Sequence, residues 1–241
     1  MERIILIETS TALCSVALAE DGAVTAYRES SAPKAHASLT AVFIREMLEE
    51  RGLTLADCDA VCVSMGPGSY TGLRVGVSTA KGLCFGSGKP LLAVGTLDTL
   101  VAQASAAPRT VIPGLTGDPL FIIPMIDARR MEVYAAVFET AGQGGKDARQ
   151  ITGTAPAIID SDSFAEYLEQ GPCLFIGDGA GKCADVIRHP NAHFCQCHPK
   201  ASSMLEPAIR AYKEKRFEDV AYFEPFYLKE FVATVSKKKL F

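Results

Sequence analysis

The sequence predicts an α/β fold in two parts, and three observations support this prediction. Residues 3–30 contain three strand-like segments in succession. From residue 36 to residue 96, helix-like and strand-like segments alternate. Between residues 105 and 120 the composition shifts to alanine, proline, glycine and threonine, which indicates a lobe boundary or a loop insertion. A chain of 241 residues is long enough for one large domain or for two lobes.

The first part opens with a predicted antiparallel meander. Its strands are RIILIE, CSVALAE and VTAYRES, and Asp21-Gly22 forms a tight turn between the last two. Residues 36–51 carry apolar side chains at three- and four-residue steps, which predicts an amphipathic helix. A buried strand at 60–65, a helix at 71–85 and a strand within PLLAVGT are predicted to follow.

The second part begins with a predicted hairpin, LFIIPMIDARRMEVYAAVFE, followed by the polar, glycine-rich segment 140–154. A helix near 161–170, the strand CLFIGDG and a final helix at about 203–217 are expected next. No internal repeat is visible in the sequence. We therefore expect a first lobe at residues 1–108 and a second lobe at 109–241.

The composition narrows the class of protein. The chain is 48% hydrophobic and 22% charged, and no segment reaches the roughly 18 apolar residues that a membrane span needs. The start, MERIILIETST, is too short in apolar residues for a signal peptide, so we expect a cytoplasmic protein. Several of the eight cysteines lie in apolar runs, which favours buried thiols over disulfides. A net charge of −4 argues against broad electrostatic binding to nucleic acid.

The segment SMGPGSYTGLR, residues 64–74, is the first candidate site. A glycine-rich loop between a strand and a helix can present backbone N–H groups to an anion. It does not match G-x-x-x-x-G-K-[ST], because Leu73 and Arg74 follow Gly72. A structural turn and a phosphate cradle therefore both remain open.

Two further segments carry incomplete phosphate-site features. GDGAGK, residues 177–182, also follows an apolar strand but fails as a P-loop, and we interpret it as a tight strand-to-helix turn. Glu8 ends the first strand, where a kinase-like ATPase has a magnesium-linked acid. The following TSTALCS contains no glycine, which argues against ATP hydrolysis.

A metal site is not predicted. In HPNAHFCQCH the candidate ligands have a spacing that is poor for zinc, and alternation places two of them on one face of a strand: His189, His193, Cys195, Cys197 and His198. His36 stands at a helix start without a nearby ligand partner in the sequence. We expect it to be a surface or capping residue.

The helix after the glycine loop carries small residues along one face. Gly72, Gly76, Thr79, Ala80 and Leu83 share this face. Because glycine inside a helix costs roughly 0.5–1 kcal/mol relative to alanine, the helix is expected to gain from close approach to a neighbour. Two interpretations remain: packing within the protein's own sheet, or a seam with another subunit.

At this point several motifs resemble the bacterial TsaB (YeaZ) family. They are IETST…CSVAL, MGPGSYTGLRVGVSTAKGL, GTLDTL, IDARRMEVYAAVF, IGDGA and EPFYLKEFVA, in the same order along nearly the whole chain. GPGSYTGLRVG is the most specific segment, and residues 140–200 are the least informative. The resemblance implies an α/β actin-like fold in two lobes, with a reduced second lobe whose C-terminal tail packs back on the first.

The resemblance also implies a role in making threonylcarbamoyladenosine on adenosine 37 of tRNAs that read codons beginning with A. The implied partners are TsaD, which is the catalytic and metal-binding subunit, and the ATPase TsaE, with tRNA bound only through the complex and a homodimer when the chain is alone. TsaD-type catalysts hold a metal with a histidine pair on the helix that matches residues 36–51. Here Thr40 follows His36 four residues later, so one histidine of the pair is missing.

This comparison implies a non-catalytic subunit with no cofactor or metal of its own, and with ATP or ADP only at a subunit junction. The expected partner-binding residues are Gly72, Gly76, Thr79, Ala80, Leu83, Leu39 and Phe43. A residual nucleotide contact would involve Glu8, Gly66, Gly68 and Ser69. Two other classes stay open: an active ATPase, kinase or glycoprotease-like metalloenzyme, and a plain homodimeric binding protein.

Overall fold

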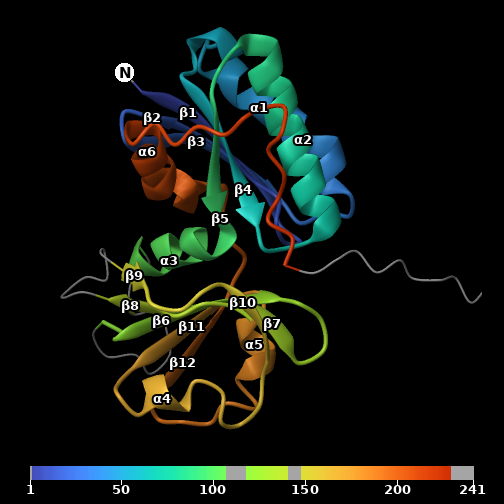
Figure 1. Cartoon of the computed structure of the whole chain (residues 1–241). Coiled ribbons are helices and arrows are strands. Elements are labelled where there is room, and N and C mark those ends of the chain that lie inside the picture. Colours follow the sequence, from blue (N-terminus) through green and yellow to red (C-terminus); the bar gives the residue numbers. More distant parts are fainter. Residues whose placement is uncertain (1, 107–117, 141–147, 229–241) are drawn as a thin grey trace, which may run out of the picture.

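The computed structural model describes residues 2–106, 118–140 and 148–228, which form two lobes, each built around a β-sheet (Figure 1). The sheet of the first lobe has the order β3-β2-β1-β4-β5, in which β1 to β3 are antiparallel and β4 and β5 run parallel to β1. These strands are β1 Arg3–Glu8, β2 Cys14–Glu20, β3 Ala23–Ser30, β4 Ala60–Gly66 and β5 Leu91–Gly95. The predicted meander and its Asp21-Gly22 turn are confirmed, with both turn residues at positive φ.

Helices cover both faces of the first sheet. On one face lie α1 Ala35–Glu50 and α2 Tyr70–Ser87, with the short 3-10 helix η1 Leu55–Asp57 before β4. The Ser69 side chain caps α2 by accepting from Gly72 N at 3.3 Å, and left-handed Gly88 ends the helix. On the other face lie η3 Ala201–Met204 and α6 Leu205–Lys213, whose alanines and Met204 complete a second apolar layer.

The C-terminal segment returns to the first lobe. Beyond α6, Glu218 N donates to Leu91 O at 2.8 Å and Phe226 N donates to Met65 O at 2.7 Å. Residues 201–228 therefore pack on the first lobe, so the second lobe is smaller than the range 109–241 that we expected. The expected boundary at residue 108 lies outside the described residues.

The second lobe repeats the topology of the first. Its sheet runs β10-β7-β6-β11-β12, again with three antiparallel strands followed by two strands parallel to the first of the set. The two lobes therefore share one topology although no repeat is visible in the sequence. Because the same topology tolerates different side chains, the duplication leaves no visible sequence period. The strands are β6 Phe121–Asp127, β7 Glu132–Ala135, β10 Ala155–Ile158, β11 Cys173–Gly177 and β12 Ala192–Gln196, with β8 Phe138–Thr140 and β9 Ala148–Gln150 beside β6.

The helices of the second lobe differ most from our expectations. Helix α3, Thr96–Ala106, was missed, although Leu97, Leu100 and Ala104 have helical spacing; it lies at the junction of the lobes and covers one face of the second sheet (Figure 1). The other face carries only α4 Ala165–Leu168 and α5 Ala180–Cys183 among the described residues. Helix α4 is shorter than predicted because a left-handed Phe164 precedes it. The final helix also ends earlier than predicted, at Lys213. No helix of the described residues is long and apolar enough to cross a membrane.

Candidate functional site

A buried carboxyl group ends the first strand at the junction of the lobes. Glu8 is 0% exposed, and its Oε1 accepts from Ser10 N at 2.6 Å and from Ser64 Oγ at 3.0 Å. Its Oε2 has no hydrogen-bond partner among the described residues. Burial raises the pKa of Glu8 to about 7, although the hydrogen bonds from Ser10 and Ser64 act in the opposite direction. The carboxyl group is thus held by its own lobe.

The glycine loop contacts the β1–β2 turn directly. Ser69 N, which precedes α2, donates to Ser10 O at 2.6 Å. A Cβ added to Gly68 would lie 2.4 Å from Ser10 O, so the glycine permits this close approach. The Ser69 amide, which a bound anion would need as a donor, already donates to the Ser10 carbonyl. Because of this contact, the residues present do not fit a phosphate between the two loops. The interpretation as a structural turn is therefore favoured over the phosphate cradle.

The predicted intersubunit seam is wrong for its three smallest residues. Gly72, Gly76 and Ala80 are buried within the first lobe. A Cβ on Gly72 would lie 2.1 Å from Thr9 O, and one on Gly76 would lie 2.2 Å from Thr9 Oγ1. These glycines let α2 pack on the turn after β1. The other predicted partner residues are not buried in this way and remain a prediction: Leu39, Phe43, Thr79 and Leu83.

The outward face of α2 has a different character. Phe85 is 88% exposed, more than any other large hydrophobic side chain of the described residues. Gly82 and Gly86 flank it, and a Cβ on either would meet no atom within 4 Å. The glycine spacing alone does not show which side of the helix is buried, so this face could not be predicted from it.

Gly66, the remaining residue of the predicted nucleotide contact, also lies against another part of the protein. Its φ of 107° requires glycine, and an added Cβ would lie 2.9 Å from Phe226 O. The C-terminal segment therefore closes over the end of β4. Within the loop after β4, the tight glycine positions are explained by contacts with the chain itself.

The second lobe has an equivalent arrangement after β6. Asp127 ends β6, and its N–H donates to Asp178 Oδ1 at 2.9 Å. Lys182 on α5 forms an ion pair with Asp127 and donates to Arg130 O and Glu132 O, both at 2.7 Å. The GDGAGK segment is the strand-to-helix turn that we expected, since β11 ends at Gly177 and α5 begins at Ala180. Asp178 and Lys182 were not singled out from the sequence.

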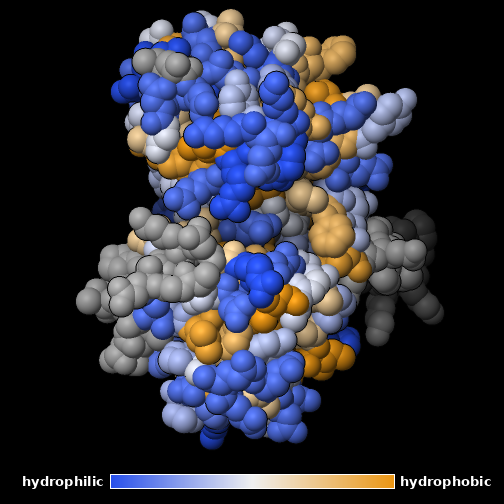
Figure 2. All heavy atoms as spheres, turned by 60° about the vertical axis from the view of Figure 1, so that its left-hand side comes forward, coloured by the Kyte–Doolittle hydropathy of each residue, from blue (hydrophilic) through white to orange (hydrophobic). Residues whose placement is uncertain are grey.

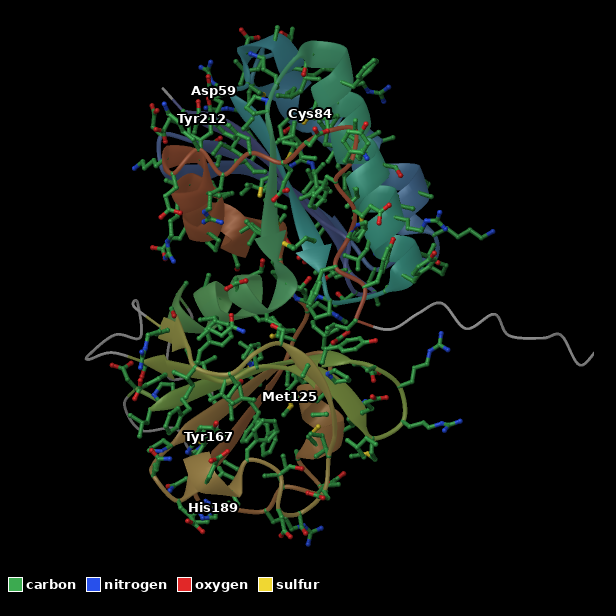
Figure 3. The ribbon with its side chains drawn as sticks, viewed as in Figure 1. Asp59, Cys84, Met125, Tyr167, His189 and Tyr212 are labelled. Carbon is green, nitrogen blue, oxygen red and sulfur yellow. The ribbon has the colours of Figure 1, made fainter. Side chains whose placement is uncertain are left out.

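The histidines and cysteines do not gather into one cluster. His189 lies at the end of the second lobe farthest from the junction, whereas His198 Nδ1 lies 4.0 Å from Asp178 Oδ2 (Figure 3). Cys195 and Cys197 are half-buried thiols on and just after β12. In the described ranges, no group of three or more His, Cys, Asp or Glu side chains has the geometry of a metal site.

His36 links α1 to the β1–β2 turn. Its Nε2 lies 2.8 Å from Thr11 O, and Thr40 Oγ1 donates to His36 O at 2.6 Å. Thr40 is buried and takes the place of the second histidine that the resemblance implied. Both side chains are therefore engaged in fixing the start of α1.

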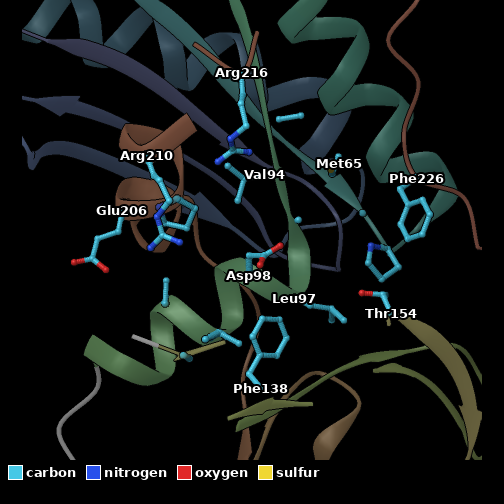
Figure 4. Close-up of a pocket in the computed structure, with 18 of the residues that line it drawn as sticks. Met65, Val94, Leu97, Asp98, Phe138, Thr154, Glu206, Arg210, Arg216 and Phe226 are labelled. Atoms are coloured by element: carbon cyan, nitrogen blue, oxygen red, sulfur yellow. The ribbon is translucent and has the colours of Figure 1, made fainter. Parts of the chain in front are cut away.

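A pocket of about 380 Å³ lies on the β5 side of the junction, where the surface is hollowed between the lobes (Figures 2 and 4). Arg210 and Arg216 extend toward Asp98 at the start of α3, above apolar side chains such as Phe138. Burial raises the pKa of Asp98, while the two arginines act in the opposite direction. Two acidic and two basic residues line the pocket, so its charges indicate no particular ligand.

The fold and the site together define a two-lobed α/β protein of the actin-like class, in which the loops that face the junction bond to the protein itself. The family model described as "TsaD: tRNA N6-adenosine threonylcarbamoyltransferase" matches residues 29–237. The chain is 30% identical to the tRNA threonylcarbamoyladenosine biosynthesis protein TsaB of Escherichia coli, over 96% of each chain. It therefore belongs to the TsaB family, within the wider family that this model describes.

Two further comparisons agree. The TsaB protein of Bacillus subtilis is 32% identical over 94% of this chain and 93% of its own. The solved structure of YeaZ from Pseudomonas aeruginosa is 27% identical, with a TM-score of 0.77 over 95% of this chain and 100% of that one. The actin-like fold expected from the sequence is thus confirmed along nearly the whole chain.

Proposed function

We propose that this chain is a non-catalytic subunit of the machinery that forms threonylcarbamoyladenosine in tRNA, and that it pairs with a TsaD-type catalytic subunit. The observation that carries the non-catalytic part is the hydrogen bond from Ser69 N to Ser10 O. It occupies the amide at the start of α2 that a phosphate would require. The names of the relatives supply the pathway.

The proposed docking face for the catalytic subunit is the outward side of α2 with the neighbouring edge of α1. Phe85 offers a large apolar side chain, and Gly82 and Gly86 leave the helix backbone open to close approach. The half-buried residues Leu39, Phe43, Thr79 and Leu83 are proposed to contribute contacts beside this face. In the absence of the catalytic subunit, the same face would pair with a second copy of the chain.

The proposal includes three finer elements. A TsaE-type ATPase joins the pair, tRNA is bound only through the assembled complex, and ATP or ADP binds only at the junction with the catalytic subunit. The nucleotide is placed at the subunit junction because the loops after β1 and β4 contact each other within the first lobe and leave no phosphate site between them. The chain is proposed to act in the cytoplasm, where its substrate tRNA is found.

Reconstitution with the TsaD-type and TsaE-type subunits of the same organism tests the proposal. We expect modified tRNA only when this chain is present, and we expect Phe85→Ser to weaken its binding to the catalytic subunit at least about tenfold in calorimetry, because an exposed anchor is lost. Ile158→Ser is the matched control, since Ile158 is 78% exposed on the second lobe.

Two results would contradict the proposal. Full modification of tRNA without this chain would remove its role in the pathway. Equal binding by wild-type protein and the Phe85→Ser variant would remove the α2 docking face and favour a plain homodimeric binding protein.

A further inference from the structure

The β6–β7 turn presents two arginines in an unusual backbone conformation. Arg129 and Arg130 have φ angles of 73° and 50°, in the left-handed region that side chains other than glycine rarely adopt. Both residues are exposed. Tight turns of this kind usually carry asparagine or glycine at these two positions. The chain therefore keeps two arginines where local backbone energetics favour other residues.

The turn is held in place by the segment GDGAGK. Lys182 Nζ donates to the carbonyl oxygens of Arg130 and Glu132, each at 2.7 Å, and pairs with Asp127. Asp127 Oδ1 in turn accepts from Arg129 N at 2.8 Å. The hydrogen bond between Asp127 N and Asp178 fixes the base of the turn. The second glycine cluster of the sequence thus acts as a support for the arginine turn.

The equivalent turn of the first lobe is buried, whereas the β6–β7 turn is exposed. The β1–β2 turn occupies the same topological position, and its residues Thr9, Ser10 and Thr11 are buried at the junction. In the second lobe the supported turn faces solvent instead. Neither guanidinium group has a hydrogen-bond or ion-pair partner within residues 2–106, 118–140 and 148–228.

Two adjacent, unpaired guanidinium groups on a fixed turn suit phosphate groups, because arginine binds phosphate through two parallel hydrogen bonds and a fixed backbone lowers the ordering cost. The chain carries a net charge of −4, so its overall charge does not by itself attract a polyanion. In the view of Figure 1 the β6–β7 turn lies on the same side of the molecule as α1 and α2, which form the proposed docking face.

Resting on the proposed function, we infer that Arg129 and Arg130 contact the phosphate backbone of tRNA in the assembled complex. Phosphate contacts of this kind position a nucleic acid without reading its sequence. An acidic protein surface is the competing partner, because arginine also forms paired hydrogen bonds with carboxylate groups. The experiment must separate these two partners.

The test measures tRNA affinity of the reconstituted complex over a range of salt concentrations. Removing two phosphate contacts in the double variant Arg129→Ala/Arg130→Ala should weaken binding and reduce the slope of log K against log salt by about 1.4–1.8. The double alanine variant should still assemble with the catalytic subunit to the wild-type extent, as measured by gel filtration. Arg129→Lys/Arg130→Lys should retain the salt slope but lose part of the affinity, because lysine cannot form the paired hydrogen bonds.

The control is Arg149→Ala/Arg188→Ala, which removes the same charge from other positions of the second lobe. The inference is overturned if both double alanine variants change the salt slope equally, or if the turn variant loses assembly and not tRNA affinity. If millimolar ATP abolishes the difference in tRNA affinity between the wild-type complex and the turn variant, the turn is a nucleotide site and the inference is overturned. A wild-type chain that never enters the complex would overturn the proposed function itself, and the inference with it.

Discussion

Glu8 couples the stability of the protein to pH at the scale of one residue. Its pKa is raised by burial from 4.5 to about 7, so between these values the folded state binds more protons than the unfolded state. The free energy of unfolding should therefore fall as the pH rises from about 4.5 to 7 and level off above that. Ionising the buried Glu8 carboxyl group therefore lowers the free energy of unfolding.

We predict that Glu8→Gln removes this pH dependence and raises the free energy of unfolding at pH 8 by up to about 3 kcal/mol, because glutamine is uncharged and keeps an acceptor for Ser10 N and Ser64 Oγ. Urea unfolding at pH 5 and pH 8 measures the effect. Glu169→Gln, at an exposed position, serves as the control and should leave the pH profile intact. A variant that follows the wild-type profile would show that Glu8 does not carry the burial cost.

Helix α2 shows how the same residue type has opposite roles on two faces of one element. Gly76 faces Thr9, whereas Gly82 faces open space. Thr9 is buried and its Oγ1 donates to Gly72 O at 2.8 Å, so it cannot easily move away from a new methyl group. The inner glycine is needed for packing, and the outer one weakens the helix.

We therefore predict that Gly76→Ala lowers the free energy of unfolding by about 1–3 kcal/mol through overpacking. Gly82→Ala should raise it by about 0.5–1 kcal/mol, because alanine is the better helix former. Urea denaturation of the isolated chain compares the two. Equal effects of the two substitutions would contradict the assignment of inner and outer faces.

The whole molecule consists of two lobes of one topology, and both lobes use the amides at a helix start internally. In the first lobe Ser69 N bonds to Ser10 O, and in the second Gly181 N bonds to Gln196 Oε1 at 2.6 Å. An anion would have to displace these acceptors on both sides of the junction. This shared arrangement argues against nucleotide turnover by the chain alone.

We predict that the isolated chain hydrolyses ATP no faster than background, which a phosphate-release assay can measure. Enzymes typically turn over at about 1 s⁻¹ or faster. Turnover of that order that disappears in Glu8→Ala would contradict the non-catalytic function and restore the ATPase alternative. Activity unaffected by this change would point instead to a contaminant.

Local patterns in the sequence were sufficient for much of the fold. Alternation and helical spacing predict β1 to β5, α1 and α2 close to their observed bounds, because each is decided by side chains near in sequence. The missing glycine after Glu8 and the Thr40 that follows His36 can also be read directly from the sequence. Helix α3 carried a usable pattern, but its position next to a composition shift obscured it.

Tertiary contacts decided the rest, because they join residues that are far apart in the sequence. Whether Gly76 faces the sheet or a partner depends on Thr9, 67 positions earlier, and spacing within the helix cannot supply that neighbour. The same holds for Lys182, whose contact with the Arg129-Arg130 turn spans more than 50 residues. The sequence by itself thus determined most of the elements and the family. The tertiary structure determined which glycines are buried, how the arginine turn is supported, and that the two lobes share one topology, because each of these depends on contacts between distant segments.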